Sequence, residues 1–215
     1  MPHELFKRFV SSVILIPLSL FFIFKGTTVF ILFLTILFLI SSSEWINMNK
    51  RLLYKVFGIN FLILSFMATY LLRNEDLELF LLIIAICVST DLGGYIFGKI
   101  IKGPKLIKIS PNKTYSGMIG GYLLSIIILN IFYVVPYFFL KPIQVWSNFL
   151  LFILSVSTIS QIGDIIFSYF KRMAKIKDTG KIIPGHGGLL DRIDGMIFSF
   201  PFSFCILKAN IFQFI

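Results

Sequence analysis

Seven apolar segments follow one another along the chain and dominate its pattern of hydrophobic and polar positions. They cover residues 9–24, 27–40, 56–72, 77–97, 118–140, 145–169 and 193–207, and short polar stretches separate them. A helix needs roughly 20 apolar residues to cross the hydrocarbon core of a bilayer. The pattern therefore predicts an all-α fold: a polytopic integral membrane helical bundle of about seven transmembrane helices.

The first two apolar segments are short, and only Lys25 and Gly26 separate them. We expect a tight helical hairpin here, with a single long tilted helix as the alternative. We divide the chain into N-terminal transmembrane helices, residues 1–76, and a second transmembrane region with two basic loops, residues 77–215. The two parts are expected to form one continuous membrane domain.

The composition agrees with this pattern. Of the 215 residues, 57% are hydrophobic and 14% are charged, and the mean hydropathy is +0.92. A soluble domain is about half apolar and about a quarter charged. The composition therefore excludes intrinsic disorder, a coiled coil and an ordinary soluble enzyme. Since the spans consume most of the chain, any chemistry must sit at helix ends, in short loops or on polar groups inside the bundle.

The positive charges are concentrated in alternate loops, as expected for a membrane protein with a defined topology. Sixteen of the twenty Lys and Arg residues fall in the N-terminal segment and in alternate loops, and the intervening segments hold only Lys25, Arg73, Lys141 and Lys208. Cytoplasmic loops of membrane proteins carry an excess of Lys and Arg. We therefore expect the N-terminus in the cytosol and the C-terminus outside. Because the charge does not form one continuous stripe, the net charge of +10 does not indicate a nucleic-acid partner.

Two of the loops expected in the cytosol are more strongly patterned than a topology signal requires. Residues 99–117 contain five lysines, residues 171–194 contain six Lys and Arg, and both loops contain Gly and Pro turn residues. Clustered cations of this kind suit anionic lipid headgroups or a polyphosphate.

Two carboxylates lie where they are energetically expensive. Asp91 and Asp164 each fall in the C-terminal half of an apolar segment. An acid at mid-span costs roughly 2.5 to 3.5 kcal/mol on insertion scales, so a functional role is the first hypothesis and a structural hydrogen bond is the alternative. Gln161, Asp164, Ser168 and Lys171 share one helix face by their spacing. That polar stripe predicts a site that leads to the second basic loop.

The second basic loop ends in a glycine-rich turn followed by acids. Gly187 and Gly188 allow backbone N–H groups to approach an anion, and His186 either donates to a phosphate or only orders the loop. Asp191 and Asp194 stand three residues apart at the start of the last segment. Carboxylates from two helices could hold a hard cation, although capping of the helix N-terminus is an alternative role for each of them.

A family resemblance rests on this stretch. Residues 168–194 read SYFKRMAKIKDTGKIIPGHGGLLDRID, and every position fits the signature of the phosphatidate cytidylyltransferases, also called CDP-diacylglycerol synthases. Asp91 with Tyr95 resembles a further family segment. Residues 110–117, SPNKTYSG, resemble another one, with Asn112 in place of a usual Lys and Ser116 in place of a usual Glu.

The resemblance implies a nucleotidyltransferase of phospholipid biosynthesis in the cell (inner) membrane, among membrane lipids, with its active site facing the cytosol. CTP and phosphatidate would give CDP-diacylglycerol and pyrophosphate. It implies Asp164, Asp191 and Lys171 as catalytic residues, with both carboxylates binding Mg²⁺ and a second cation such as K⁺ left open. The implied substrate-binding residues are Asp91, Tyr95, Ser110, Lys113, Thr114, Ser168, Arg172, Lys177, Asp178, His186, Gly187, Gly188, Arg192 and Asp194.

Two other functions are compatible with the residues. Intramembrane acids and a polar stripe also occur in a transporter or flippase for an anionic lipid or solute, which needs access from both faces of the membrane. A related CTP-dependent enzyme that acts on another lipid phosphate is the second alternative. Gly117 and Gly121 form a small-residue pair that could pack helices within one chain or between two chains, so a homodimer stays open.

Overall fold

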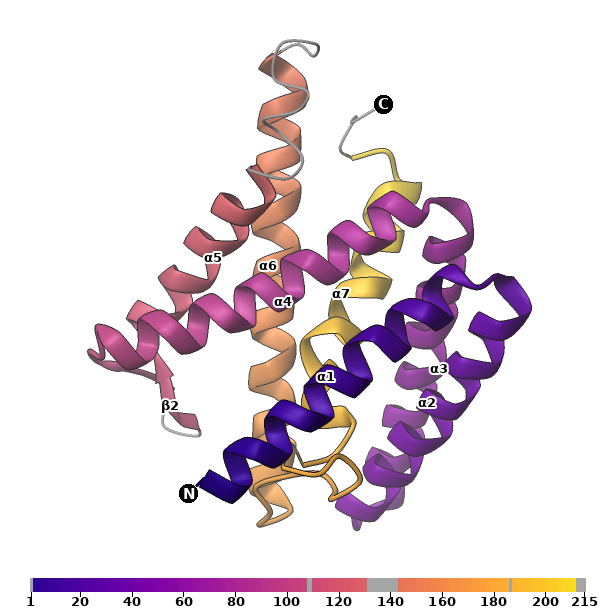
Figure 1. Cartoon of the computed structure of the whole chain (residues 1–215), viewed down its shortest axis with the longest axis vertical. Coiled ribbons are helices and arrows are strands. Elements are labelled where there is room, and N and C mark those ends of the chain that lie inside the picture. The colour runs from indigo at the N-terminus through magenta and orange to yellow at the C-terminus, as the bar shows by residue number, and fades with distance from the viewer. Residues whose placement is uncertain (1, 108–109, 131–142, 186, 212–215) are drawn as a thin grey trace.

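The protein is described here from a computed structural model, in which residues 2–107, 110–130, 143–185 and 187–211 are described. These residues form seven α-helices and one two-stranded β hairpin (Figure 1). The helices are α1 Pro2–Phe24, α2 Thr27–Met48, α3 Leu52–Glu75, α4 Leu77–Ile100, α5 Tyr115–Leu129, α6 Ile143–Met173 and α7 Leu190–Lys208, and the strands are β1 Lys105–Ile107 and β2 Ser110–Thr114.

The helices confirm the predicted all-α membrane fold. Four of them are long and apolar enough to cross a bilayer, namely α2, α3, α4 and residues 147–173 of α6, and shorter apolar helices cover residues 10–24 and 115–127. Many large apolar side chains on these helices are exposed, as expected for lipid-facing surface. The number of spans and the cytosolic N-terminus stay predictions. The expected segment 118–140 is helical up to Leu129, and residues 131–142 lie outside the described part.

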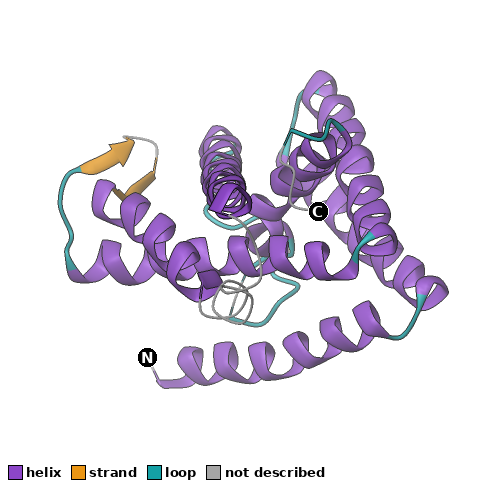
Figure 2. Ribbon diagram, turned by 90° about the horizontal axis from the view of Figure 1, so that it is seen from above, coloured by secondary structure: helices purple, strands orange, loops and turns teal. Residues whose placement is uncertain are grey.

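The predicted break between the first two helices is confirmed, but they do not pack as a tight hairpin: α1 diverges from α2 beyond the turn (Figure 2), and most of its described large apolar side chains are exposed. The chain breaks between α1 and α2 at Lys25 and Gly26, and Gly26 has a φ of 120°, which a residue with a side chain rarely adopts. Because this break ends one helix and starts the next, the alternative of a single long helix is wrong. Figure 1 shows α1 crossing in front of the bundle, with α2 turning back beside α3.

Glycines bring α4 and α5 into close contact. A Cβ atom on Gly93 would lie 2.3 Å from the carbonyl oxygen of Gly120, and one on Gly117 would lie 2.8 Å from the carbonyl oxygen of Gly94. On the same face, Gly121 approaches the carbonyl of Thr90. The Gly117 and Gly121 pair therefore packs within the chain. A homodimer, if one forms, needs a different contact surface.

Two buried clusters hold the bundle together around α6, which runs vertically through Figure 1. One cluster includes Ile83 and Ile86 of α4 with Phe152 of α6. The other joins Trp45 of α2 and Leu62 of α3 to Phe167 of α6. Burial of side chains of this size contributes about 1.5–3 kcal/mol each in water, and in lipid the close packing itself holds the helices together.

The first basic loop has more structure than the sequence predicted. It forms an antiparallel hairpin in which Lys105 pairs with Thr114 and Ile107 pairs with Ser110, visible as the two orange strands in Figure 2. At its base, Ser116 Oγ donates to the carbonyl oxygen of Lys102, and Thr114 Oγ1 caps α5 by accepting from the N–H of Gly117 at 3.1 Å. Ser116, where the resembling family has Glu, thus fixes the base of the hairpin.

Candidate active site

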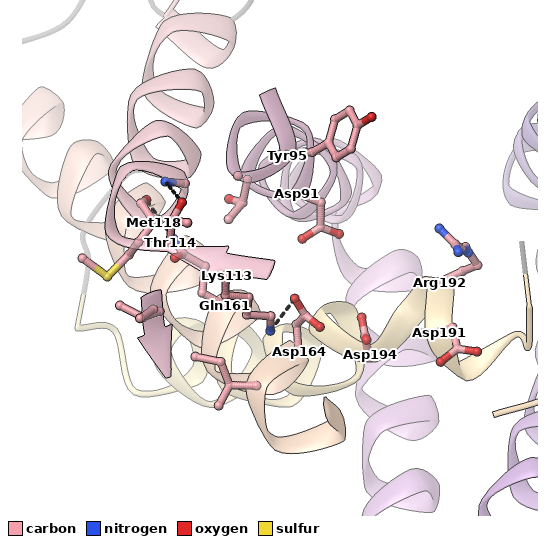
Figure 3. A pocket seen from close by; sticks show the side chains of 15 residues that line it. Asp91, Tyr95, Lys113, Thr114, Met118, Gln161, Asp164, Asp191, Arg192 and Asp194 are labelled. Carbon is pink, nitrogen blue, oxygen red and sulfur yellow. Dashed lines mark hydrogen bonds and ion pairs between the residues drawn. The ribbon is translucent and has the colours of Figure 1, made fainter. Parts of the chain in front are cut away.

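A cavity of about 310 Å³ lies where α4, α5, α6, α7 and the β hairpin meet (Figure 3). Its wall combines charged side chains with small and apolar residues. The lining residues are Thr90, Asp91, Gly94, Tyr95, Leu106, Lys113, Thr114, Gly117, Met118, Gln161, Asp164, Ile165, Asp191, Arg192 and Asp194. Eight of the residues expected at the site therefore come together: Asp91, Tyr95, Lys113, Thr114, Asp164, Asp191, Arg192 and Asp194.

Three carboxylates from three different helices converge on this cavity. Asp91 comes from α4, Asp164 from α6 and Asp194 from α7, and their side chains are drawn around one open space in Figure 3. Carboxylates that share one cavity repel one another when they are ionised. An arrangement of this kind is stable when cations occupy or border the space.

One such cation is Lys113 of strand β2. Its Nζ atom lies 2.6 Å from Asp164 Oδ2, and only 20% of the lysine side chain is exposed (Figure 3). The hairpin therefore has a definite role, because it brings Lys113 from a surface loop onto a carboxylate inside the bundle. Arg192 borders the same cavity from α7.

Asp191 stands at the edge of the cavity with both carboxylate oxygens already bonded. Oδ1 accepts from Lys171 Nζ at 2.8 Å, and Oδ2 accepts from the N–H groups of Thr179 and Gly188 and from the Thr179 hydroxyl. Burial raises the pKa of Asp191, but the hydrogen bond and the charge of Lys171, together with the two N–H groups, outweigh it and leave the pKa below its ordinary value. Asp191 therefore stays ionised at neutral pH.

The remaining expected residues lie outside the cavity wall. Lys171 reaches the site only through Asp191, and Arg172 donates to the carbonyl oxygen of Ile176 in its own loop. Gly188 binds Asp191 through its N–H, while Lys177 and Asp178 are exposed. Ser110, Ser168 and Gly187 do not line the cavity, and His186 falls outside the described residues. Their roles stay predictions.

Some polar residues at or beside the cavity had no individual role assigned from the sequence. Gln161 lines the cavity, and its place on the polar stripe of α6 was a usable signal. Glu44 of α2 is buried and accepts from the N–H groups of Leu189 and Leu190, next to Asp191. Glu44 follows three serines just beyond the apolar segment 27–40, so the rule that singled out Asp91 did not reach it.

Comparison with known proteins agrees with this site. Residues 50–210 match the cytidylyltransferase family. The phosphatidate cytidylyltransferase of Rickettsia bellii (strain RML369-C) is 32% identical over 209 residues, 94% of this chain and 90% of the relative. That of Rickettsia felis (strain ATCC VR-1525 / URRWXCal2) is 34% identical over 210 residues, 95% of this chain and 92% of the relative. That of Staphylococcus haemolyticus (strain JCSC1435) is 40% identical over 140 residues, 64% of this chain and 52% of the relative. The chain belongs to the cytidylyltransferase family.

Proposed function

We propose that this protein transfers the cytidylyl group from CTP to phosphatidate, giving CDP-diacylglycerol and pyrophosphate. The observation that carries the proposal is the cavity in which Asp91, Asp164 and Asp194 meet Lys113 and Arg192 among apolar helices. A site with both signs of charge suits a metal-bound polyphosphate, and its place in a membrane bundle suits a lipid co-substrate. The names of the relatives support the same reaction.

The reaction needs charge neutralisation more than it needs a strong base. The second ionisation of a phosphate monoester has a pKa of about 6, so the phosphate of phosphatidate is largely a dianion at neutral pH. One of its oxygens forms a bond to the α-phosphorus of CTP, and the bond from that phosphorus to the bridging oxygen breaks, releasing pyrophosphate. Because an anion attacks a polyanion, fixed cations that neutralise and align the groups lower the barrier.

This chain supplies such cations from two directions. Lys113 enters the cavity from the β hairpin, and Arg192 enters from the first turn of α7. Lys171 holds Asp191 in its ionised, oriented state rather than facing the cavity itself. We assign Lys113 and Arg192 to phosphate binding, and we assign Lys171 to fixing Asp191.

The carboxylates fit a magnesium ion. Mg²⁺ takes oxygen ligands, usually one or two carboxylates with waters and substrate phosphates. The described residues contain no group of three or more His, Cys, Asp or Glu side chains arranged to hold a metal by themselves, so substrate phosphates would complete the coordination. Asp164 fits this role, with Asp194 beside it. Asp191 could bind the ion only by giving up one of its present hydrogen bonds. The ion would stabilise negative charge on the phosphates as a Lewis acid.

We place the protein in the cell (inner) membrane with this cavity open to the cytosol, where CTP is available. The concentration of Lys and Arg in alternate loops supports the orientation. Two further cavities are apolar: one lies between α2 and α3 and includes Leu34 and Phe66, and the other includes Phe57 and Phe167. Neither has a charged side chain in its wall. The charged groups that a transferase needs lie instead in the site cavity.

Purified protein in detergent, with labelled CTP, Mg²⁺ and phosphatidate, tests the proposal. A phosphatidate cytidylyltransferase forms labelled CDP-diacylglycerol and an equal amount of pyrophosphate. A transporter forms no labelled lipid, because it moves its substrate between two compartments without changing its covalent bonds, and micelles have no two compartments. Replacing phosphatidate by diacylglycerol or by another lipid phosphate detects the related CTP-dependent enzymes, which would prefer one of those acceptors.

A further inference from the structure

The buried glutamate near the end of α2 is the most informative polar group outside the cavity. Glu44 lies in the last turns of α2 and is only 3% exposed. Its Oε1 accepts from the N–H of Leu189 at 2.9 Å, and its Oε2 accepts from the N–H of Leu190 at 2.8 Å. The Thr179 hydroxyl also lies 3.1 Å from Oε2. All these partners belong to the second basic loop or the start of α7, more than 130 positions away in sequence.

These hydrogen bonds do the work of an N-cap side chain, which α7 lacks. The first N–H groups of a helix have no partner within the helix, and a side chain just before the helix usually supplies one. The residue at that position here is Leu189, whose side chain cannot accept a hydrogen bond. The Glu44 carboxylate takes over this role from another helix, and its negative charge is favourable at a helix N-terminus. The two backbone N–H donors also make its burial tolerable.

Glu44 and Asp191 hold adjacent parts of one short segment. The N–H of Gly188 bonds to Asp191, and the next two N–H groups, from Leu189 and Leu190, bond to Glu44. The Thr179 hydroxyl lies 3.1 Å from an oxygen of each carboxylate. Any displacement of Glu44 therefore moves the backbone from which Asp191 projects.

The packing around Glu44 leaves little room for such displacement. A Cβ atom on Gly180 would lie 2.6 Å from Glu44 Oε1, and one on Gly188 would lie 2.8 Å from the same oxygen and 2.2 Å from Thr179 Oγ1. The glycines at these two positions are thus required for the loop to close onto the carboxylate. The fit between loop and glutamate is specific in shape as well as in hydrogen bonding.

We propose that Glu44 is a positioning residue of the active site: it touches no substrate, and it fixes the loop and the helix start that carry Asp191 and Asp194. The inference rests on the proposed transferase function. It assigns a role in the reaction to the N-terminal helices, because Glu44 precedes the residues 50–210 that match the family.

The test is Glu44→Gln in the full-length protein, with Ser41→Ala as the matched control. Ser41 is equally buried on the same helix, and its hydroxyl has no hydrogen-bond partner among the described residues. Glutamine keeps the size of the side chain and one oxygen but loses the charge and one acceptor. Two measurements are made: kcat per folded molecule, normalised by size-exclusion chromatography, and the rate of tryptic cleavage at Lys175, Lys177 and Lys181, all exposed in the loop.

We expect kcat of Glu44→Gln to fall about 10²-fold, the scale of a small misplacement of catalytic groups, with a smaller change in KM for CTP. Cleavage after those three lysines should accelerate, while cleavage in the first basic loop at Lys102 and Lys105 should stay at the wild-type rate. Ser41→Ala should match the wild type in both measurements. An unchanged kcat per folded molecule, or unchanged cleavage of the loop, overturns the proposal, because a purely structural role lowers only the folded amount.

If Glu44→Gln does not fold, Glu44→Asp replaces it. The shorter side chain keeps the charge but withdraws it from the loop, and we expect kcat at least about tenfold lower, as for other groups that orient an active-site ligand. Wild-type kcat in folded Glu44→Asp, with wild-type cleavage, overturns the proposal. If the wild type itself makes no CDP-diacylglycerol, the proposed function fails, and the cleavage rates alone decide whether Glu44 holds the loop.

Discussion

Lys171 Nζ lies 2.8 Å from Asp191 Oδ1, and this ion pair joins the end of α6 to the first turn of α7 across the whole second basic loop. The two side chains are only 13% and 4% exposed. Their separation of 20 positions gives no sign of the pairing in the sequence, since the loop between them has no regular repeat. The pair joins the two ends of the loop, and Glu44 accepts a hydrogen bond from Leu189 near the end of the loop.

The burial of this pair predicts a large cost for removing one partner. Lys171→Met leaves the Asp191 charge buried with only the donors from Thr179 and Gly188. Breaking a buried ion pair in this way typically costs about 3–5 kcal/mol. We expect a clear loss in the free energy of unfolding, measured by denaturant titration in detergent.

The chain offers a control of the same chemistry. Lys208 and Glu75 also form a pair at 2.8 Å, but their side chains are 56% and 46% exposed. Exposed pairs contribute about 0–1 kcal/mol, so Lys208→Met should change the stability little. Equal losses in Lys171→Met and Lys208→Met would show that the Lys171–Asp191 pair is not buried in the folded protein.

Close packing of α4 on α5 gives a second stability prediction. A Cβ atom on Gly93 would overlap the carbonyl oxygen of Gly120 at 2.3 Å, whereas one on Gly94 would make an ordinary contact of 3.7 Å with Gly117. Gly93→Ala should therefore lower the stability by about 1–3 kcal/mol, the usual cost of overpacking. Gly94→Ala should be neutral or slightly stabilising, because alanine favours the helix. Thermal unfolding of the two variants in the same detergent measures the difference. A lower stability of Gly94→Ala than of Gly93→Ala would contradict this packing.

The hydrophobic pattern predicted the helices well. Each helix that crosses lipid must be a long apolar segment, so the sequence shows it without knowledge of its tertiary contacts. All seven predicted segments contain helix, and the break at Lys25 and Gly26 fell where the pattern placed it. The β hairpin was missed, because strands of 3 and 5 residues in a lysine-rich loop carry too few alternating positions to signal a strand.

The site was predicted in part, for a related physical reason. Asp91 and Asp164 stood out because an acid among apolar residues is expensive, and the structure brings both to one cavity. Sequence spacing reports neighbours on one helix but not contacts between distant segments. The pairing of Lys113 with Asp164 and the bonds from Glu44 to Leu189 and Leu190 are contacts of that second kind.

The expected orientation leads to a labelling prediction. In a Cys205→Ser background, single cysteines at the exposed positions Lys105 and Lys177 should resist a membrane-impermeant thiol reagent in intact cells, because both loops are expected in the cytosol. A cysteine at Glu75, the last residue of α3, should react, because this end of α3 is expected outside the cell. Permeabilised cells serve as the control in which all three sites react. Labelling of the Lys105 or Lys177 site from outside would reverse the topology and remove access for cytosolic CTP.

Substitution of the two carboxylates expected to bind the metal should affect turnover in both cases but stability in only one. Asp164→Asn and Asp191→Asn should each lower turnover by at least about 10²–10³-fold, as expected for groups that stabilise charge in the transition state. Asp191→Asn should also reduce stability, because it leaves Lys171 without its buried partner. The double variant should be little slower than either single one, since residues that act as one unit are not additive. Turnover and unfolding of the three variants separate these effects, and additive losses in turnover would show that the two residues act independently.

The most direct test of the whole account is the turnover of labelled CTP with phosphatidate by Asp164→Asn, compared with the wild type at saturating Mg²⁺. Asp178→Asn, in the exposed part of the loop, and Glu75→Gln, at the end of α3, are the comparisons. The account predicts labelled CDP-diacylglycerol from the wild type, a loss of at least about 10²-fold in folded Asp164→Asn, a milder loss in Asp178→Asn and no loss in Glu75→Gln. Near-normal formation of labelled lipid by Asp164→Asn would contradict it, because the reaction would then take place without the carboxylate at the centre of the proposed site.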